Sequence, residues 1–301
     1  MKRILLSLAP VFALYAQAPS DAEIRAILVE RIDKLQQGVG IVAGVVTPEG
    51  RRFVSYGTFG VADSRPVAPD SVFEIGSVTK VFTSLLLADM VQRGEVSLDD
   101  PVAKYLPAEV KVPERGGKKI TLVDLATHTS ALPRLPSNLA PKDASNPYAD
   151  YSVEQLYGFL SGYELTRDIG SKMDYSNLGV GLLGHALARR TGMDYETLVR
   201  NRITGPLKMD DTGIRLSAAM KKRLAKGHNE TRQPAGQLGS TDDRGRGRAA
   251  QRRARHAAVR GGAPGIGGIA ARARDGRDDQ GAASDGAAEY GDRARMDHRQ
   301  P

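Results

Sequence analysis

The sequence contains no cysteine, which excludes disulfide bonds, thiolate catalysis and metal sites built on cysteine. Its five histidines are widely separated and do not form the HExxH pair of zinc peptidases. No glycine-rich loop stands between a strand and a helix, where it could hold a phosphate. We therefore expect no metal ion and no other cofactor. No apolar run approaches the roughly 18–20 residues of a spanning helix, so a polytopic membrane protein is also excluded.

Charges of both signs are plentiful, and the positive excess is unevenly placed. The 301 residues include 43 Lys and Arg against 35 Asp and Glu, which gives a formal net charge of +8. Half of this excess lies in residues 239–301, which contain 13 Arg, no Lys and 9 acidic residues. The rest of the chain is close to balance and needs no polyanionic partner, so we expect no nucleic acid to bind it.

Residues 1–18 have the three-part pattern of a secretory signal peptide. Two basic residues follow the first methionine, an apolar stretch runs from Ile4, and Ala16 and Ala18 offer small residues to a signal peptidase. The apolar positions run continuously rather than along one face, which argues against an amphipathic helix. We expect this segment to be removed, leaving a periplasmic or secreted protein without a transmembrane helix.

The composition changes abruptly from about Gly239. Of the 63 residues from there on, 39 are Arg, Gly or Ala, and such a segment buries too little apolar surface to offset its ordering entropy. We interpret residues 239–301 as a low-complexity tail, either disordered or the product of a frameshift near residue 235. A basic arm for nucleic acid is a third interpretation, which the interleaved acidic residues and the export signal argue against.

Residues 19–238 carry the signals of one folded domain. A capping box at Ser20 to Glu23 starts an amphipathic helix, and the apolar runs 40–47 and 51–60 predict an antiparallel hairpin. Further helices are expected over 77–93, from Thr121, from Ser152, over 177–190 and over 194–203. This order predicts an α+β fold, with an antiparallel sheet flanked by helices and a mostly helical subdomain.

Ser77 and Lys80 stand at the start of the helix expected over 77–93. Residues three apart share a helical face at about 5–6 Å between Cβ atoms, so the lysine amine can reach the serine hydroxyl. The helix N-terminus favours developing negative charge, and the Ser77 amide can donate to an oxyanion. Apolar residues recur along this helix, and we expect them to bury it: Val78, Val81, Phe82, Leu85, Leu86, Met90 and Val91. The pair has the elements of a Ser–Lys acyl-transfer site, although Ser-x-x-Lys alone more often marks a capping serine and an exposed lysine.

A second candidate element is Tyr175-Ser-Asn177, just before the helix expected over 177–190. A phenolate near a lysine can act as a general base, and an amide can orient a substrate. The alternative is a loop tyrosine followed by a capping residue. We interpret His128 as a hydrogen-bonded turn residue and His185 as structural. A Ser–His–Asp triad using Ser77 stays open, but nothing marks a particular partner for it.

Three segments in order, over about residues 20–235, resemble the penicillin-recognising serine hydrolases. They are GSVTKVFTSLLLADMVQRGEVSLDDPVAKYLP (76–107), ITLVDLATHTSALP (120–133) and MDYSNLGVGLLGHALARRTG (173–192). The resemblance is greatest to class C β-lactamases and related D-alanyl-D-alanine carboxypeptidases and esterases. The family's THTSGLP element stands here as Thr127 to Pro133, with Ala131 in place of glycine.

The resemblance implies a β-lactamase/transpeptidase-like fold and hydrolysis through an acyl-enzyme. Ser77 would be the nucleophile, Lys80 and Tyr175 would share the proton transfers, and Asn177 would contact the substrate amide. The substrate would be a β-lactam, a D-Ala amide from peptidoglycan, or an ester. The resemblance does not choose among these, and the sequence leaves the oligomeric state open.

The C-terminal third departs from the family pattern. The family's K-[ST]-G or H-x-G strand binds the substrate carboxylate and donates to the oxyanion, and no such triplet follows residue 192. We therefore expect an incomplete sheet, with two strands in place of about five. Three hypotheses follow: an active serine hydrolase, a truncated or frameshifted inactive member of the family, and a nucleic-acid-binding protein with a basic tail.

Overall fold

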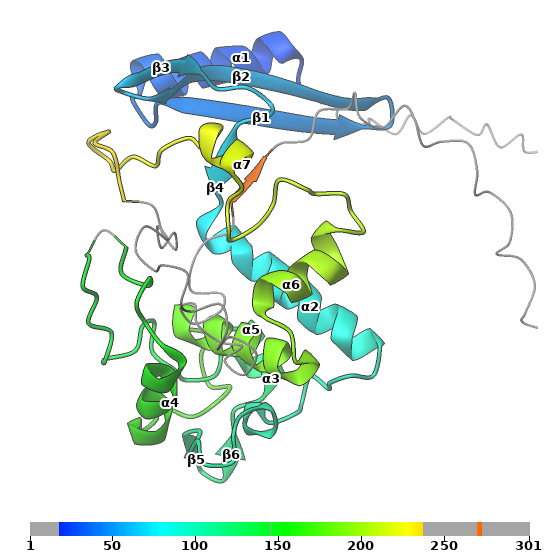
Figure 1. Cartoon of the computed structure of the whole chain (residues 1–301), viewed down its shortest axis with the longest axis vertical. Coiled ribbons are helices and arrows are strands. Elements are labelled where there is room, and N and C mark those ends of the chain that lie inside the picture. The colour runs from blue at the N-terminus through cyan, green and yellow to red at the C-terminus, as the bar shows by residue number, and fades with distance from the viewer. Residues whose placement is uncertain (1–17, 145, 237–269, 273–301) are drawn as a thin grey trace, which may run out of the picture.

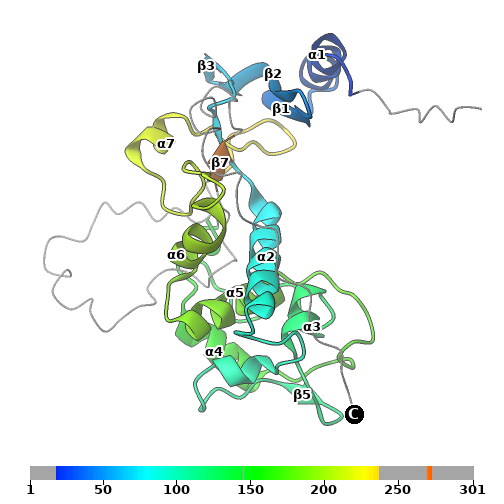
Figure 2. The same cartoon turned by 90° about the vertical axis from the view of Figure 1, so that its right-hand side faces the viewer.

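The computed structural model describes residues 18–144, 146–236 and 270–272. A sheet with one covering helix lies at one end of the molecule, and a group of helices lies at the other (Figure 1). Helix α2 runs between the two ends in both views (Figures 1 and 2). The signal peptide expected over 1–18 lies outside the described residues except for Ala18, and so does most of the tail expected over 239–301.

The sheet end begins with helix α1 (Asp21–Val29), which continues as a π-helical turn over Glu30–Lys34. The expected capping box is present: the Ser20 side chain accepts from the Glu23 amide, and the Glu23 side chain accepts from the Ser20 amide. Ile24 and Leu28 on one face of α1 pack against Val54 of the sheet. These buried contacts hold the helix on the sheet.

The expected hairpin consists of β1 (Gly40–Thr47) and β2 (Gly50–Gly60), paired antiparallel. A short strand β3 (Asp63–Pro66), which the sequence analysis did not predict, pairs with the other edge of β2. The resulting order is β1-β2-β3, an open antiparallel sheet. The α+β fold class predicted from the sequence is confirmed.

A second, two-stranded sheet joins the sheet end to α2. Strand β4 (Val72–Glu74) pairs antiparallel with β7 (Ala270–Arg272), which belongs to the segment expected as a low-complexity tail. The Val72 amide donates to the carbonyl of Arg223 at 2.8 Å, and the Val72 carbonyl accepts from the Ala225 amide at 2.8 Å. Strand β4 is thereby fixed on two sides just before the chain enters α2.

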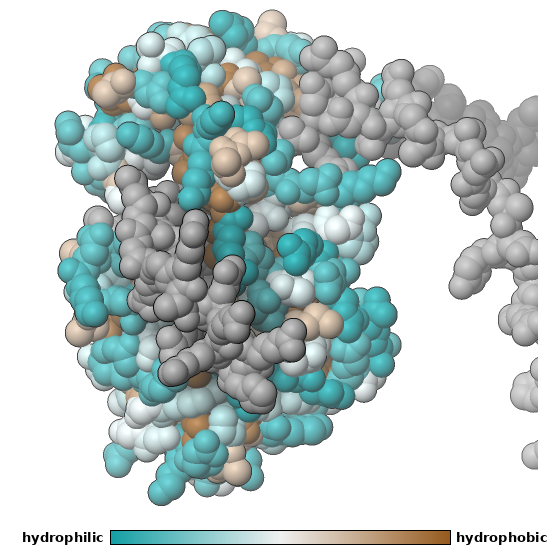
Figure 3. Space-filling model, in the orientation of Figure 1, coloured by the Kyte–Doolittle hydropathy of each residue, from teal (hydrophilic) through white to brown (hydrophobic). Residues whose placement is uncertain are grey.

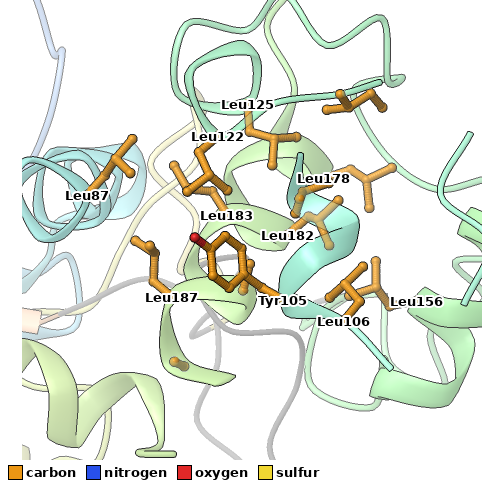
Figure 4. Packing of buried hydrophobic residues seen from close by; sticks show 14 of the residues in the cluster. Leu87, Tyr105, Leu106, Leu122, Leu125, Leu156, Leu178, Leu182, Leu183 and Leu187 are labelled. Carbon is orange, nitrogen blue, oxygen red and sulfur yellow. The ribbon is translucent and has the colours of Figure 1, made fainter. Parts of the chain in front are cut away.

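The other end of the molecule is mostly helical. Its elements are the 3₁₀ turn Val102–Tyr105, β5 (Glu114–Arg115), β6 (Lys118–Lys119), α3 (Leu122–Ala126), α4 (Val153–Gly162), α5 (Asn177–Thr191), α6 (Tyr195–Val199) and the π turn Arg200–Thr204. The last helix, α7 (Ala218–Lys222), lies at the sheet end instead, where Met220 packs against Val72 of β4 (Figure 1). The capping boxes expected at Thr121 and Ser152 are both present. Leucines of α2, α3 and α5 meet in one buried cluster (Figure 4). Helix α5 is buried along most of its length and forms the centre of this core.

Helix α2 (Thr79–Gln92) differs from its prediction in its start and in its buried face. It begins two residues after Ser77, which lies in a 3₁₀ turn over Gly76–Val78. Val78, Val81 and Leu85 are exposed by 54%, 62% and 46%, so the expectation that they are buried is wrong. The buried face instead carries two threonines with Leu86, Leu87 and Met90.

The visible face of the molecule is mostly hydrophilic, with hydrophobic residues showing between its two ends (Figure 3). In the described part of the chain, no helix combines the length and the apolar character needed to cross a membrane.

Candidate active site

Ser77 stands at the junction between β4 and α2. Gly76 has a φ of 51°, a left-handed conformation that glycine adopts without strain, and it turns the chain out of the strand. The Val78 amide donates to the Ile75 carbonyl at 3.1 Å and closes the 3₁₀ turn. The Ser77 side chain is exposed at this corner. Among the described residues the Ser77 amide makes no backbone hydrogen bond, so it is available to an incoming group.

Lys80 and Tyr175 both reach the Ser77 hydroxyl. The Lys80 ammonium donates to Ser77 Oγ at 3.2 Å, as the three-residue spacing predicts. The Tyr175 hydroxyl donates to the same oxygen at 2.7 Å, from a position 98 residues further along the chain. The structure thus brings together three of the four residues singled out in the sequence.

The electrostatic surroundings of Tyr175 are strongly positive. Lys80 Nζ lies 4.7 Å from the centroid of its ring, and Arg134 Cζ lies 5.3 Å from it. Burial acts to raise the pKa of the Tyr175 phenol, but interactions with Lys80 and Ser77 and the charges of Lys80 and Arg134 outweigh it. The pKa of Tyr175 is therefore lowered from its ordinary value of 10.0.

The loop 127–134 holds the segment that carries Tyr175. His128 Nδ1 accepts from the Ser176 amide at 3.1 Å, and the His128 carbonyl accepts from the Asp174 amide at 2.8 Å. Ser176 Oγ donates to the Pro133 carbonyl at 2.7 Å. The His128 ring also lies 4.6 Å from the Tyr175 ring, centroid to centroid. These contacts agree with the interpretation of His128 as a turn residue that positions its neighbours.

Asn177, the fourth candidate, is held through its backbone. It is the first residue of α5, and its amide donates to the Arg134 carbonyl at 3.1 Å. In the part of the chain that the structure describes, no hydrogen bond joins the Asn177 side chain to Ser77, Lys80 or Tyr175. The structure therefore does not bring this side chain into the hydrogen-bonded cluster.

His185 lies in the buried interior of α5. Its Nε2 and the Tyr157 hydroxyl are 2.7 Å apart, and burial lowers the pKa of the imidazole to about 4. No histidine of the described residues hydrogen-bonds to Ser77, so they contain no Ser–His–Asp triad built on this serine. Across the same residues, no group of three or more His, Asp or Glu side chains is arranged to hold a metal ion.

Sequence reasoning missed Arg134. Its only signal was a position directly after the Thr127 to Pro133 element, and a single arginine after a proline indicates nothing by itself. The exposed guanidinium lies over Tyr175, and the Arg134 carbonyl accepts from the amides of Asn177 and Leu178 at 3.1 and 3.2 Å.

Comparison with known proteins identifies the family. A family model described as Beta-lactamase matches residues 28–278. The D-alanyl-D-alanine-carboxypeptidase/endopeptidase AmpH of Escherichia coli K12 is 38% identical over 237 residues, which are 74% of this chain and 60% of AmpH. A β-lactamase of the same organism is 33% identical over 198 residues, which are 65% of this chain and 49% of that protein.

Solved structures agree with this assignment. A β-lactamase/D-alanine carboxypeptidase from Yersinia pestis has a TM-score of 0.62 and 28% identity, over 84% of this chain and 66% of that one. A class C β-lactamase from Rhodobacter sphaeroides has a TM-score of 0.61 and 28% identity, over 83% and 62%. The chain spans about half to two thirds of the length of these relatives. With its fold and its matched residues, the chain belongs to the beta-lactamase family.

Proposed function

We propose that this chain is a serine hydrolase that forms an acyl-enzyme at Ser77. The observation that carries the proposal is the double hydrogen bond to Ser77 Oγ, from the Lys80 ammonium at 3.2 Å and the Tyr175 hydroxyl at 2.7 Å. A nucleophile within reach of a base that is itself held by other groups is the arrangement that covalent catalysis requires.

The proton transfers follow from this geometry. With Tyr175 ionised, its oxygen takes the Ser77 proton while Ser77 Oγ bonds to the carbonyl carbon and the carbonyl oxygen becomes an oxyanion. The Lys80 charge stabilises the phenolate before transfer, and the Ser77 amide donates to the oxyanion. The intermediate then expels the leaving nitrogen or oxygen, which takes the proton from the tyrosine. In deacylation, a water molecule attacks the Ser77 ester with the same proton transfers. This step releases the carboxylic acid and restores the Ser77 hydroxyl.

The substrate classes come from the relatives. AmpH is described as a D-alanyl-D-alanine carboxypeptidase and endopeptidase, and the other relatives as β-lactamases. We assign this chain to the same classes, a β-lactam or a D-Ala amide of peptidoglycan, with esters as a further class that the same chemistry serves. Asn177, placed at the start of α5 next to the Tyr175 segment, is assigned to contact the substrate amide.

Labelling by a fluorescent penicillin tests this function. We expect the full chain to become covalently labelled and the Ser77→Ala variant to remain unlabelled. Ser84→Ala removes an exposed hydroxyl from the same helix and should label like the unchanged chain. A folded chain that does not react with the probe would overturn the proposal. Hydrolysis of a cephalosporin, a D-Ala-D-Ala peptide and a p-nitrophenyl ester then identifies the preferred substrate class.

A folded but unreactive chain is the second candidate, and one observation favours it. No K-[ST]-G or H-x-G triplet follows residue 192, and loss of one oxyanion donor costs about 10²–10³ in rate. The frameshift hypothesis for residues 239–301 belongs to this candidate. Resequencing the gene across codons 230–245 decides whether the Arg/Ala/Gly-rich stretch is a product of the natural reading frame.

Export and domain limits are part of the same proposal. Residues 1–18 act as the signal peptide, residues 19–238 form the hydrolase domain, and the mature protein works in the periplasm or outside the cell. N-terminal sequencing of the protein recovered from a bacterial periplasmic fraction should begin near Pro19. An intact Met1 in that fraction would contradict cleavage.

A further inference from the structure

Arg134 presents an unpaired cation beside the reacting groups. Its guanidinium carbon lies 5.3 Å from the centroid of the Tyr175 ring, and its side chain is exposed. No carboxylate of the described residues lies within ion-pair distance of it, whereas Arg167, Arg202 and Arg223 each have one. A guanidinium has a planar fork of donors that matches a carboxylate, so this group is free to bind one.

The position of Arg134 is fixed by its backbone. Its carbonyl accepts from the Asn177 amide at 3.1 Å and from the Leu178 amide at 3.2 Å, at the first turn of α5. The preceding carbonyl, that of Pro133, accepts from Ser176 Oγ at 2.7 Å. Arg134 is therefore tied to the same segment that places the Tyr175 hydroxyl on Ser77. A charge on a fixed backbone next to the nucleophile loses less entropy on binding a ligand than one on a free loop.

The charges around this point favour an anion. Lys80 and Arg134 both lie near the Tyr175 ring. Asp174, which directly precedes Tyr175 in the sequence, forms an ion pair with Arg167 at 3.0 Å. The positive charges of Lys80 and Arg134 attract an anion and repel a cation. A substrate that has a negative group next to its reacting carbonyl is therefore favoured here.

We propose that Arg134 binds a carboxylate of the substrate and makes the site selective for anionic acyl donors over their neutral esters. This inference rests on the proposed function, because it names the substrate group that the same site recognises. Arg134 is a specificity residue here: it contacts the ligand and leaves the bond-making to Ser77, Lys80 and Tyr175.

Equilibrium binding to a chain that cannot be acylated tests this inference separately from catalysis. The Ser77→Ala variant is titrated with a cephalosporin that has a free carboxylate and with the methyl ester of that compound. We expect the carboxylate to bind more tightly, and Arg134→Gln in the same background to raise its Kd about tenfold, as expected for one charged hydrogen bond. The Kd of the methyl ester should change less than about twofold.

Two further variants sharpen the comparison. Arg31→Gln removes the same charge from an exposed position in the π-helical turn that follows α1, and should leave both Kd values unchanged. Arg134→Lys keeps the charge but loses the fork, so its Kd for the carboxylate should fall between those of the parent and Arg134→Gln.

Equal affinity for the two compounds, or an equal loss for both in Arg134→Gln, overturns the inference. Failure of the proposed function shows differently, as an absence of penicillin labelling in the chain with Ser77 intact.

Discussion

The Tyr175 hydroxyl donates a 2.7 Å hydrogen bond to Ser77 Oγ across a separation of 98 residues. The bond joins the segment just before α5 to the 3₁₀ turn just before α2, and Lys80 reaches the same oxygen from the first turn of α2. Because the phenol and the amine meet at one hydroxyl, removing either should affect the same chemical step.

Tyr175→Phe should reduce the rate of Ser77 acylation by about 10²–10⁴-fold, the usual contribution of a general base. The phenyl ring can keep its packing against His128, so the free energy of unfolding should change little. Tyr163→Phe is a matched control, since Tyr163 stacks on Phe159 within the helical subdomain. Stopped-flow measurement of penicillin acylation gives the rates. An unchanged rate in Tyr175→Phe would remove this tyrosine from the mechanism.

The acylation rate should rise with pH, with a midpoint below 10. Burial opposes ionisation of Tyr175, but Lys80, Ser77 and Arg134 lower its pKa from 10.0, and the base works only when deprotonated. His128, whose pKa is itself lowered by burial and by the Lys80 charge, is the other titratable ring that faces Tyr175. Rates measured from pH 5 to 10.5 should lose this rise in Tyr175→Phe. A midpoint at or above 10 would contradict the lowered pKa.

The free energy of unfolding should fall as the pH is lowered from about 6.5 to 4, in part because of His185. Burial lowers the pKa of His185 to about 4 from 6.5, so in this range the unfolded chain binds a proton that the folded chain does not. The contribution is present in full above pH 6.5 and amounts to at most about 3 kcal/mol. Urea unfolding at pH 7 and 4.5 measures it. The loss on acidification should be smaller in His185→Gln, and an equal loss in both proteins would exclude His185 as the cause.

Leu86→Ala should destabilise the chain by about 2–5 kcal/mol, whereas Leu85→Ala should cost less than about 1 kcal/mol. Leu86 is fully buried and Leu85 is 46% exposed, so these neighbours on α2 form a matched pair. Urea or thermal unfolding of the two variants measures the difference. A larger loss in Leu85→Ala would mean that α2 is rotated about its axis relative to this structure.

Much of the fold could be predicted from local patterns. The capping boxes at Ser20, Thr121 and Ser152 mark three helix starts correctly, because each depends on residues only three apart. Strands β3 and β7 were not predicted, since they have four and three residues and show no alternation. Strand β7 also forms only by pairing with β4, almost 200 positions earlier, which no local pattern encodes.

The buried face of α2 could not be read from hydrophobicity. Val78, Val81 and Leu85 are apolar and exposed. Thr83 is polar and buried, and its hydroxyl is satisfied by a hydrogen bond of 2.7 Å to the Tyr195 hydroxyl, 112 positions away. At the site, the spacing alone predicted the contact of Ser77 with Lys80. The place of Tyr175 followed from the family resemblance, and that of Arg134 required the three-dimensional arrangement.

The loop 127–134 contains two non-glycine residues with positive φ, His128 and Ala131, both at 62°. Each costs of the order of 1–2 kcal/mol, which only surrounding contacts can offset. Those contacts are the hydrogen bonds to Asp174, Ser176, Asn177 and Leu178. The loop 127–134 and the residues 174–178 at the start of α5 should therefore open as one cooperative unit. Amide hydrogen exchange should give the same free energy of opening for both segments.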